Sequence, residues 1–177
     1  MAPLDPRARP PLVAEALVTE LAAFDVTWLL AGSYVLRLYG ADLEPNDLDV
    51  VVERSPENLE RVAQLLDHLE AVPQWCGLSE WDIGSVEDHL AWKPWPATTA
   101  HLDQLFVTQH GMFDLPFKLV PDYAELLPGS SVMAIGEVDV RVCDPRRVLK
   151  ALETRDRKKD RARAEVYAEM RRRFGLS

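Results

Sequence analysis

Two aspartates on alternate positions of an apolar run are the residues best suited to chemistry in this chain. Asp47 and Asp49 lie in the stretch DLDVVVE, and residues two apart on a strand face the same side of it. Two buried carboxylates side by side repel each other, and their burial is costly without a counter-charge. Mg²⁺ prefers hard oxygen ligands and commonly joins protein carboxylates to substrate phosphates. The pattern therefore predicts a magnesium site at Asp47 and Asp49, with two solvated strand-end aspartates as the alternative.

A third carboxylate would complete a site for in-line attack on a phosphate. Asp114 is the best candidate because it interrupts the apolar, β-like stretch GMFDLPF. Asp103, at the start of the preceding strand, is the second choice. The alternative for Asp114 is a residue beside a turn with no ligand. We expect Asp114 to join the two strand aspartates as a metal ligand.

The turn Gly32-Ser33 follows the apolar run VTWLLA and precedes the aspartates. A glycine between a strand and a helix lets the backbone approach a ligand closely, and free N–H groups at a helix N-terminus bind phosphate. An ordinary structural turn would use the same residues. Gly32 and Ser33 are therefore candidates for phosphate binding only together with the aspartates.

The string L-A-G-S, thirteen residues, and then D-L-D-V resembles the signature of the DNA polymerase β-type nucleotidyltransferase superfamily. The resemblance implies that the Gly32-Ser33 turn holds the triphosphate of a nucleoside triphosphate. It also implies that Asp47 and Asp49 hold Mg²⁺, with the third carboxylate, here Asp114, on a following strand. The implied fold is a mixed central sheet flanked by helices, with a C-terminal helical segment.

The stretch VCDPRRVLKALETRDRKKDRARAEVY is similar to the closing helices of nucleotidyltransferase toxins of the AbiEii and MenT type. The matching positions are Lys150, Arg155, Lys159 and Asp160. The resemblance implies catalytic roles for Lys150 and Asp160 and nucleotide binding by Arg155 and Lys159. A lysine facing the metal would neutralise triphosphate charge, and Asp160 would orient it or a neighbouring arginine. A solvated helix laced with charges is the alternative.

The chain departs from these toxins just before the first aspartate. The toxins usually carry an arginine and a serine or threonine there, whereas this chain has Leu43, Glu44, Pro45 and Asn46. Arg37 is the candidate that would replace the missing arginine in nucleotide binding.

The resemblance implies Mg²⁺-dependent transfer of a nucleoside monophosphate from a nucleoside triphosphate (NTP) to an acceptor hydroxyl. By the same resemblance, the acceptor is the 3′ end of tRNA and the protein is a toxin restrained by a cognate antitoxin. Two alternatives stay open. One is transfer to a small molecule or to a protein hydroxyl, and the other is a binding module that keeps the fold but is catalytically silent.

The elements that must position these residues alternate between helix and strand, which predicts a mixed-sheet α/β (α+β) domain. Residues 72–99 are irregular or hold an inserted helix. The helices are expected at 12–24, 33–39, 55–69, 122–127 and from 145 to about 174 with a break near Asp156, and the strands at 26–31, 47–53, 102–108, 111–119, 131–135 and 138–142. We expect a flexible lead-in at 1–11, a nucleotidyltransferase core at 12–143, and C-terminal helices at 144–177 that pack on the same domain.

The composition indicates which partners and which cellular compartment to expect. The chain has 177 residues, with Lys+Arg 20 against Asp+Glu 29 and a net charge of −9, which argues against a whole surface that binds nucleic acid. Basic residues nevertheless crowd the region 141–173 and predict a local basic face. Two distant cysteines fit a reducing compartment. No apolar run approaches the ~20 residues that span a bilayer, so we expect a cytoplasmic protein without a membrane partner.

Overall fold

A mixed sheet lies at the centre of the structure, a computed structural model that describes residues 4–77, 79–155 and 157–176. Within these residues, seven strands follow the order β3-β4-β5-β2-β1-β7-β6. The strands are β1 (Trp28–Ala31), β2 (Asp47–Val52), β3 (Val72–Pro73), β4 (Leu105–Thr108), β5 (Gly111–Asp114), β6 (Ser131–Ile135) and β7 (Val138–Val142). The expected α/β class is confirmed.

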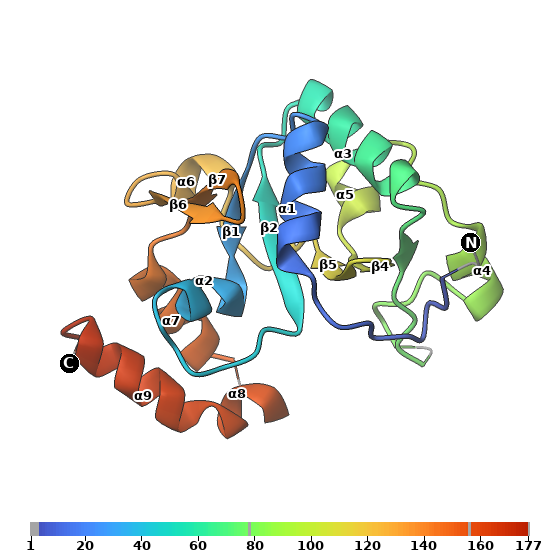
Figure 1. The fold of residues 1–177 in the computed structure, drawn as a ribbon. Coiled ribbons are helices and arrows are strands. Elements are labelled where there is room, and N and C mark those ends of the chain that lie inside the picture. The colour runs from blue at the N-terminus through green and yellow to red at the C-terminus, as the bar shows by residue number, and fades with distance from the viewer. Residues whose placement is uncertain (1–3, 78, 156, 177) are drawn as a thin grey trace.

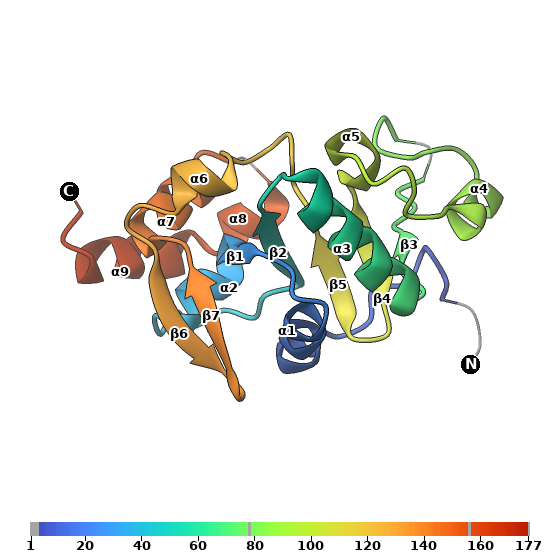
Figure 2. The same ribbon diagram turned by 90° about the horizontal axis from the view of Figure 1, so that it is seen from above.

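The sheet is mixed: two pairs of neighbouring strands are parallel, and the other pairs are antiparallel. β1 pairs with β2 antiparallel, whereas β2 pairs with β5 in parallel and β1 with β7 in parallel. The hairpin of β6 and β7 forms one end of the sheet, as Figure 2 shows. Its predicted strands match the observed bounds, because Gly136 adopts the positive φ that its turn requires.

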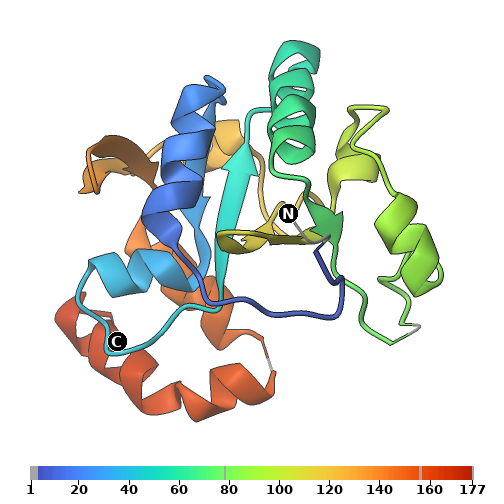
Figure 3. The ribbon, with the colours of Figure 1, turned by 45° about the vertical axis from the view of Figure 1, so that its right-hand side comes forward.

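Helices cover the sheet and close its ends. They are α1 (Ala14–Ala23), α2 (Gly32–Leu38), α3 (Pro56–His68), α4 (Val86–Ala91), α5 (Thr99–Leu102), α6 (Tyr123–Leu126), α7 (Pro145–Glu153), α8 (Lys158–Ala162) and α9 (Ala164–Arg173). Helices α1 and α3 stand side by side along one face of the sheet (Figures 1 and 3). Their apolar sides enter the main core.

Helix α3 begins where its sequence predicts. The Ser55 hydroxyl accepts a hydrogen bond from the backbone N–H of Asn58, and Pro56 occupies the first turn. The buried Asn58 side chain then joins the helix to the strands. Its amide accepts a hydrogen bond from Thr27 N–H at 2.8 Å and donates to the carbonyls of Thr27 and Glu53 at 2.9 and 2.7 Å.

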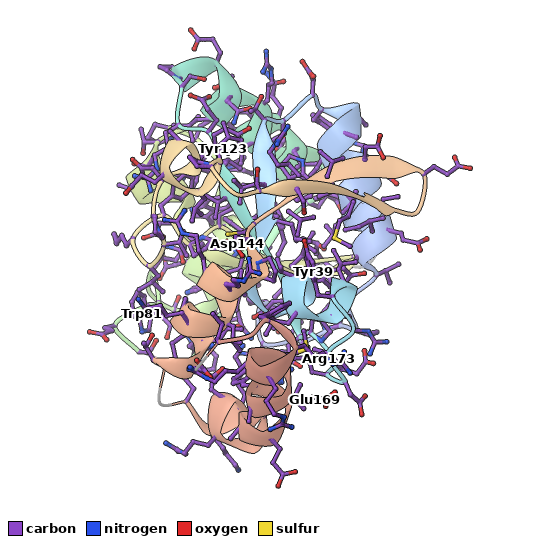
Figure 4. The ribbon with its side chains drawn as sticks, turned by 90° about the vertical axis from the view of Figure 1, so that its left-hand side faces the viewer. Tyr39, Trp81, Tyr123, Asp144, Glu169 and Arg173 are labelled. Carbon is purple, nitrogen blue, oxygen red and sulfur yellow. The ribbon has the colours of Figure 1, made fainter. Side chains whose placement is uncertain are left out.

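Among the described residues, the C-terminal region forms three helices, one more than a single break in the expected helical stretch would give. Helix α7 ends at Glu153 and α8 begins at Lys158; Asp156, where a break was expected, lies outside the described residues. Helix α9 returns to the end of α2. There the Arg173 side chain donates to the Gly40 carbonyl at 3.0 Å, and Figure 4 shows Arg173 near Tyr39. The C-terminal helices therefore pack on the sheet domain through α2.

Several expected segments differ in detail. The strand expected at 102–108 begins at Leu105, because Thr99–Leu102 form α5. The strand expected at 111–119 ends at Asp114, because Leu115 is followed by Pro116, which has no N–H for a ladder. Residues 4–11 of the expected flexible lead-in form no helix or strand but lie against β3, where Trp75 N–H donates to the Pro6 carbonyl at 2.9 Å. Residues 72–99, expected to be irregular or to hold an inserted helix, contain β3, α4 and the first residue of α5 among the described positions. No helix in the described part of the chain is both long enough and apolar enough to cross a membrane.

Candidate functional site

Three carboxylates meet where β2 lies beside β5. The parallel register places Asp49 opposite Asp114, and Asp47 two residues earlier on the same face of β2. Asp47 is buried, and Asp49 and Asp114 are partly buried. Asp103, the second choice for the third carboxylate, ends α5 instead and forms an ion pair with Lys118 at 3.0 Å. The structure therefore brings Asp114, and not Asp103, to the strand aspartates.

Burial and neighbouring carboxylates raise the pKa of two residues of the cluster, Asp49 and Asp114. Burial, followed by the charge of Asp47, raises the pKa of Asp49 from 3.8 to about 7. Burial, followed by the charges of Asp49 and Asp47, raises the pKa of Asp114 well above its usual range. Nearby cations oppose both effects without cancelling them. The protein's own side chains therefore do not fully compensate negative charge at this cluster, and Asp49 and Asp114 keep their protons to higher pH than a free carboxyl does.

Gly32 is pressed against this cluster. Ala31, the last residue of β1, pairs with Asp49 across the sheet, and α2 begins immediately at Gly32. The φ angle of Gly32 is +65°, and a Cβ placed on it would lie 1.7 Å from Asp49 Oδ2. Only glycine fits there, because any side chain would overlap the carboxylate. Ser33 is buried in the first turn of α2.

Cations from the C-terminal region face the carboxylates. Lys159 Nζ on α8 lies 3.5 Å from Asp47 Oδ2. Lys159, Arg155 and Arg157 each lower the pKa of Asp49 through their charge. Arg155 and Lys159, which the resemblance marked for nucleotide binding, therefore lie on the same side of the fold as the carboxylates.

Asp160 holds Arg157 rather than a lysine. Arg157 Nε donates to Asp160 Oδ2 at 2.5 Å, and Arg157 Nη2 donates to Oδ1 at 3.2 Å. The Tyr167 hydroxyl also donates to Asp160, at 3.1 Å. Although burial opposes ionisation, these bonds and the charge of Arg157 lower the pKa of Asp160. Asp160 is therefore a buried anchor for Arg157, which fits its expected role of orienting a neighbouring arginine.

Two other predicted site residues lie elsewhere. Lys150 is exposed on α7, and it is not among the cations that shift the pKa of Asp49. The side chain of Arg37 donates to the Leu43 carbonyl at 3.2 Å and forms an ion pair with Glu44 at 3.0 Å. Arg37 thus stabilises the loop before β2. The recorded contacts bring neither residue to the carboxylates.

A small cavity adjoins the cluster on the side of α7. It has a volume of about 130 Å³, and Gly32 and Asp49 form part of its wall. Two arginines, Arg147 and Arg155, also line it. Sequence reasoning missed Arg147 and Arg157. The i, i+3 spacing of Arg157 and Asp160 in RDRKKD was the available signal for Arg157.

The side chains of the cluster are the kind of ligand that a hard divalent cation prefers, but their positions do not yet form a metal site. All three side chains offer carboxylate oxygens, which Mg²⁺ prefers, and their uncompensated charge favours a cation. Within residues 4–77, 79–155 and 157–176, however, no three His, Cys, Asp or Glu side chains form a group that could hold a metal ion as they stand. Binding would therefore require the carboxylates to move toward a common centre.

Comparison with known proteins adds no family to this geometry. No protein-family model, curated protein or solved structure matches the chain significantly. The case for function rests on the residues themselves.

Proposed function

We propose that this protein is a Mg²⁺-dependent nucleotidyltransferase that moves a nucleoside monophosphate from an NTP to an acceptor hydroxyl. The observation that carries the proposal is the uncompensated cluster of Asp47, Asp49 and Asp114, pressed against Gly32 and faced by Lys159. The three carboxylates would hold Mg²⁺, which in such a site neutralises phosphate charge and orients the reacting oxygens.

The chain's own residues would position the two substrates. In the reaction, the acceptor oxygen forms a bond to the α-phosphorus, the bond from that phosphorus to the pyrophosphate oxygen breaks, and the hydroxyl proton is released to water. The triphosphate would lie at the Gly32-Ser33 turn, beside the Asp49 carboxylate that occupies the space of the missing side chain at position 32. Lys159 and Arg157 would offset charge on the phosphates. Positioning and charge neutralisation supply the catalysis, with no covalent intermediate on the protein.

The proposal extends to the acceptor through the resemblance described above. We propose that the 3′ end of tRNA receives the nucleotide in the cytoplasm, and that a cognate antitoxin restrains the protein. Exposed cations on and beside α8, including Arg157, Lys158 and Arg161, support contact with an RNA backbone next to the carboxylates. Binding to RNA should then weaken steeply with added salt.

A labelling experiment tests the transfer. The purified protein would be incubated with each α-³²P-labelled NTP, Mg²⁺ and total tRNA, and the RNA would be separated on a denaturing gel. The same reactions would contain Asp49→Asn, which keeps the shape of the carboxylate without its charge. Asp42→Asn is the matched control, because Asp42 is exposed in the loop before β2.

Label on tRNA with the wild type and with Asp42→Asn, but not with Asp49→Asn, is the expected result. Label on a protein or a small molecule instead would support the alternative acceptors. No Mg²⁺-dependent binding of any NTP would overturn the proposal and favour a catalytically silent module.

A further inference from the structure

The two edges of the sheet are protected to different degrees. At one edge, β3 has only 2 residues, and the N-terminal segment lies against it, where Leu4 and Ala8 pack on a small cluster that includes Val72. At the other edge, β6 has 5 residues, and within the described part of the chain no strand pairs with its outer side. Figure 2 shows that this side faces away from the other strands. β6 is therefore the open edge of the sheet.

The sequence of β6 does nothing to block pairing with another strand. Natural sheets usually guard an exposed edge with a charged residue, a proline or a bulge. β6 reads SVMAI, which contains neither a charge nor a proline, and its register with β7 runs without a bulge. Val132 is 55% exposed and Ala134 is exposed on the same face, whereas Met133 packs against the core on the other face. The edge therefore suits an uncharged partner strand.

The outward backbone groups of β6 belong to Val132 and Ala134. The two-residue turn Gly136-Glu137 closes the hairpin, and the residues that flank such a turn form a hydrogen-bonded pair. Bonding to the neighbouring strand then alternates, so every second residue counted back from Ile135 turns its backbone groups toward β7. The N–H and C=O groups of Val132 and Ala134 point the other way, and among the described residues no backbone hydrogen bond joins them to another segment. These groups are placed to bond a further strand.

A second copy of β6 fits this edge by two-fold symmetry. When two β6 strands pair antiparallel about Met133, Val132 of each copy lies opposite Ala134 of the other. These are the residues whose backbone groups point outward, so each pair can exchange both of its hydrogen bonds. The same register sets a larger side chain against a smaller one on both sides of the axis, and Met133 meets its own counterpart. The edge is thus complementary to itself.

Charges beyond the ends of β6 are also complementary in this register. Gly136 lies opposite Ser130 of the second copy, because the two positions are equally far from Met133. The Arg141 side chain donates to the Ser130 hydroxyl at 3.2 Å, so the guanidinium of the second copy stands beside the turn. Glu137 is exposed in that turn. Each copy therefore brings a carboxylate to the other's arginine, which an unrelated strand would have no reason to match.

We propose that two copies of this protein associate through β6 and form a two-fold dimer with one continuous sheet. The inference goes beyond the proposed function and does not depend on it. Contact between two strands of 5 residues is small, so the dimer should form only at high protein concentration.

Sedimentation velocity of the full-length protein, from roughly 1 μM to roughly 200 μM, tests the association in the range where weak interfaces form. The wild type should shift from monomer to dimer across this range. Val132→Lys, which places a charge on the edge, and Ala134→Pro, which removes an outward N–H, should each weaken association by about tenfold or more. Leu90→Lys is the matched control, because Leu90 is 46% exposed on α4, which contacts β3 at the opposite edge.

A charge exchange tests the register. Glu137→Arg and Arg141→Glu should each weaken association by roughly threefold or more, because each places like charges together on both sides of the axis. The double variant should return to within about twofold of the wild type, because the charges are again opposite. Circular dichroism should show that every variant is folded.

Each other outcome counts against the proposal. A wild type that stays monomeric at about 200 μM would overturn it and leave the edge to a strand of a different protein. A dimer that persists in folded Val132→Lys and Ala134→Pro would also overturn it, because association would then use another surface. Failure of the double variant to recover would overturn the two-fold register about Met133.

Discussion

Replacing Asp49 with asparagine should stabilise the metal-free protein, and the gain should grow between about pH 4 and pH 7. In the folded protein, burial and the charge of Asp47 raise the pKa of Asp49 from 3.8 to about 7. Between these two values the unfolded chain has lost the proton, whereas the folded chain retains it. The wild-type free energy of unfolding therefore falls as pH rises through this window and levels off above it. Asparagine carries no titrating proton, so the variant escapes that loss.

The magnitude follows from the width of the window. A shift of one pKa unit corresponds to about 1.4 kcal/mol, so a shift from 3.8 to about 7 corresponds to roughly 4 kcal/mol above pH 7. A typical domain has a free energy of unfolding of only ~5–15 kcal/mol. The Asp49 contribution is therefore large enough to measure by denaturant unfolding.

Urea unfolding of the wild type and Asp49→Asn at pH 5, 6, 7 and 8, with EDTA present, measures the effect. The difference in free energy of unfolding should increase with pH up to about 7 and then stay constant. Asp42→Asn controls for the loss of one exposed negative charge. Parallel pH profiles for wild type and Asp49→Asn would refute the reasoning, because they would mean that Asp49 ionises at no cost in the folded protein.

Three further substitutions test how the site is built and anchored. Gly32→Ala should reduce nucleotidyl transfer by roughly 10²-fold or more in the labelling assay, because its Cβ would displace the Asp49 carboxylate; unchanged transfer would show that the close approach is unimportant. Lys159→Met should weaken calorimetric binding of Mg²⁺ and NTP by about tenfold, or ~1.4 kcal/mol, with the exposed neighbour Lys158→Met as control. Equal losses in the two lysine variants would indicate a general charge effect. Asn58→Ala should lower the free energy of unfolding, measured with urea, by ~2–4 kcal/mol, because the backbone groups of Thr27 and Glu53 lose their hydrogen-bond partner. The control Gln64→Ala, on the exposed side of α3, should change the free energy of unfolding by less than ~0.5 kcal/mol.

The sequence predicts the two strand aspartates because strand periodicity alone decides which residues share a face. Asp47 and Asp49 must point the same way once their segment is a strand, and Leu48 must point the other way into the core. The hairpin at 131–142 is equally local, since its turn glycine and alternating residues lie close in the chain. Features that depend only on neighbouring residues in the chain, such as these, can be predicted from the sequence.

Contacts between distant segments were less predictable. The pairing of Asp49 with Asp114 depends on the register of two strands far apart in sequence, and no local pattern sets that register. Lys150 shows the same limit on a helix. The buried side of α7 consists of Val148, Leu149 and Leu152, and Lys150 is left in solvent. Helix α7 ends at Glu153 and the chain starts a new helix, α8, at Lys158. As a result Lys159, nine residues after Lys150, is the lysine that reaches Asp47.

A bound metal ion would account for two unfavourable features of the cluster, the repulsion between its carboxylates and the backbone conformation of Gly32. Asp49 and Asp114 are grouped so that their charges oppose each other, and Gly32 must adopt a left-handed conformation to let the Asp49 carboxylate approach its backbone. Packing alone explains neither feature, because an asparagine at position 49 would fill the same volume without the charge. A divalent cation that carries phosphates would offset the repulsion, and the close approach at Gly32 would hold the Asp49 carboxylate in place for that cation. Mg²⁺ and an NTP should therefore stabilise the wild type against unfolding most above pH 7, where the metal-free cluster costs most, and should stabilise Asp49→Asn far less.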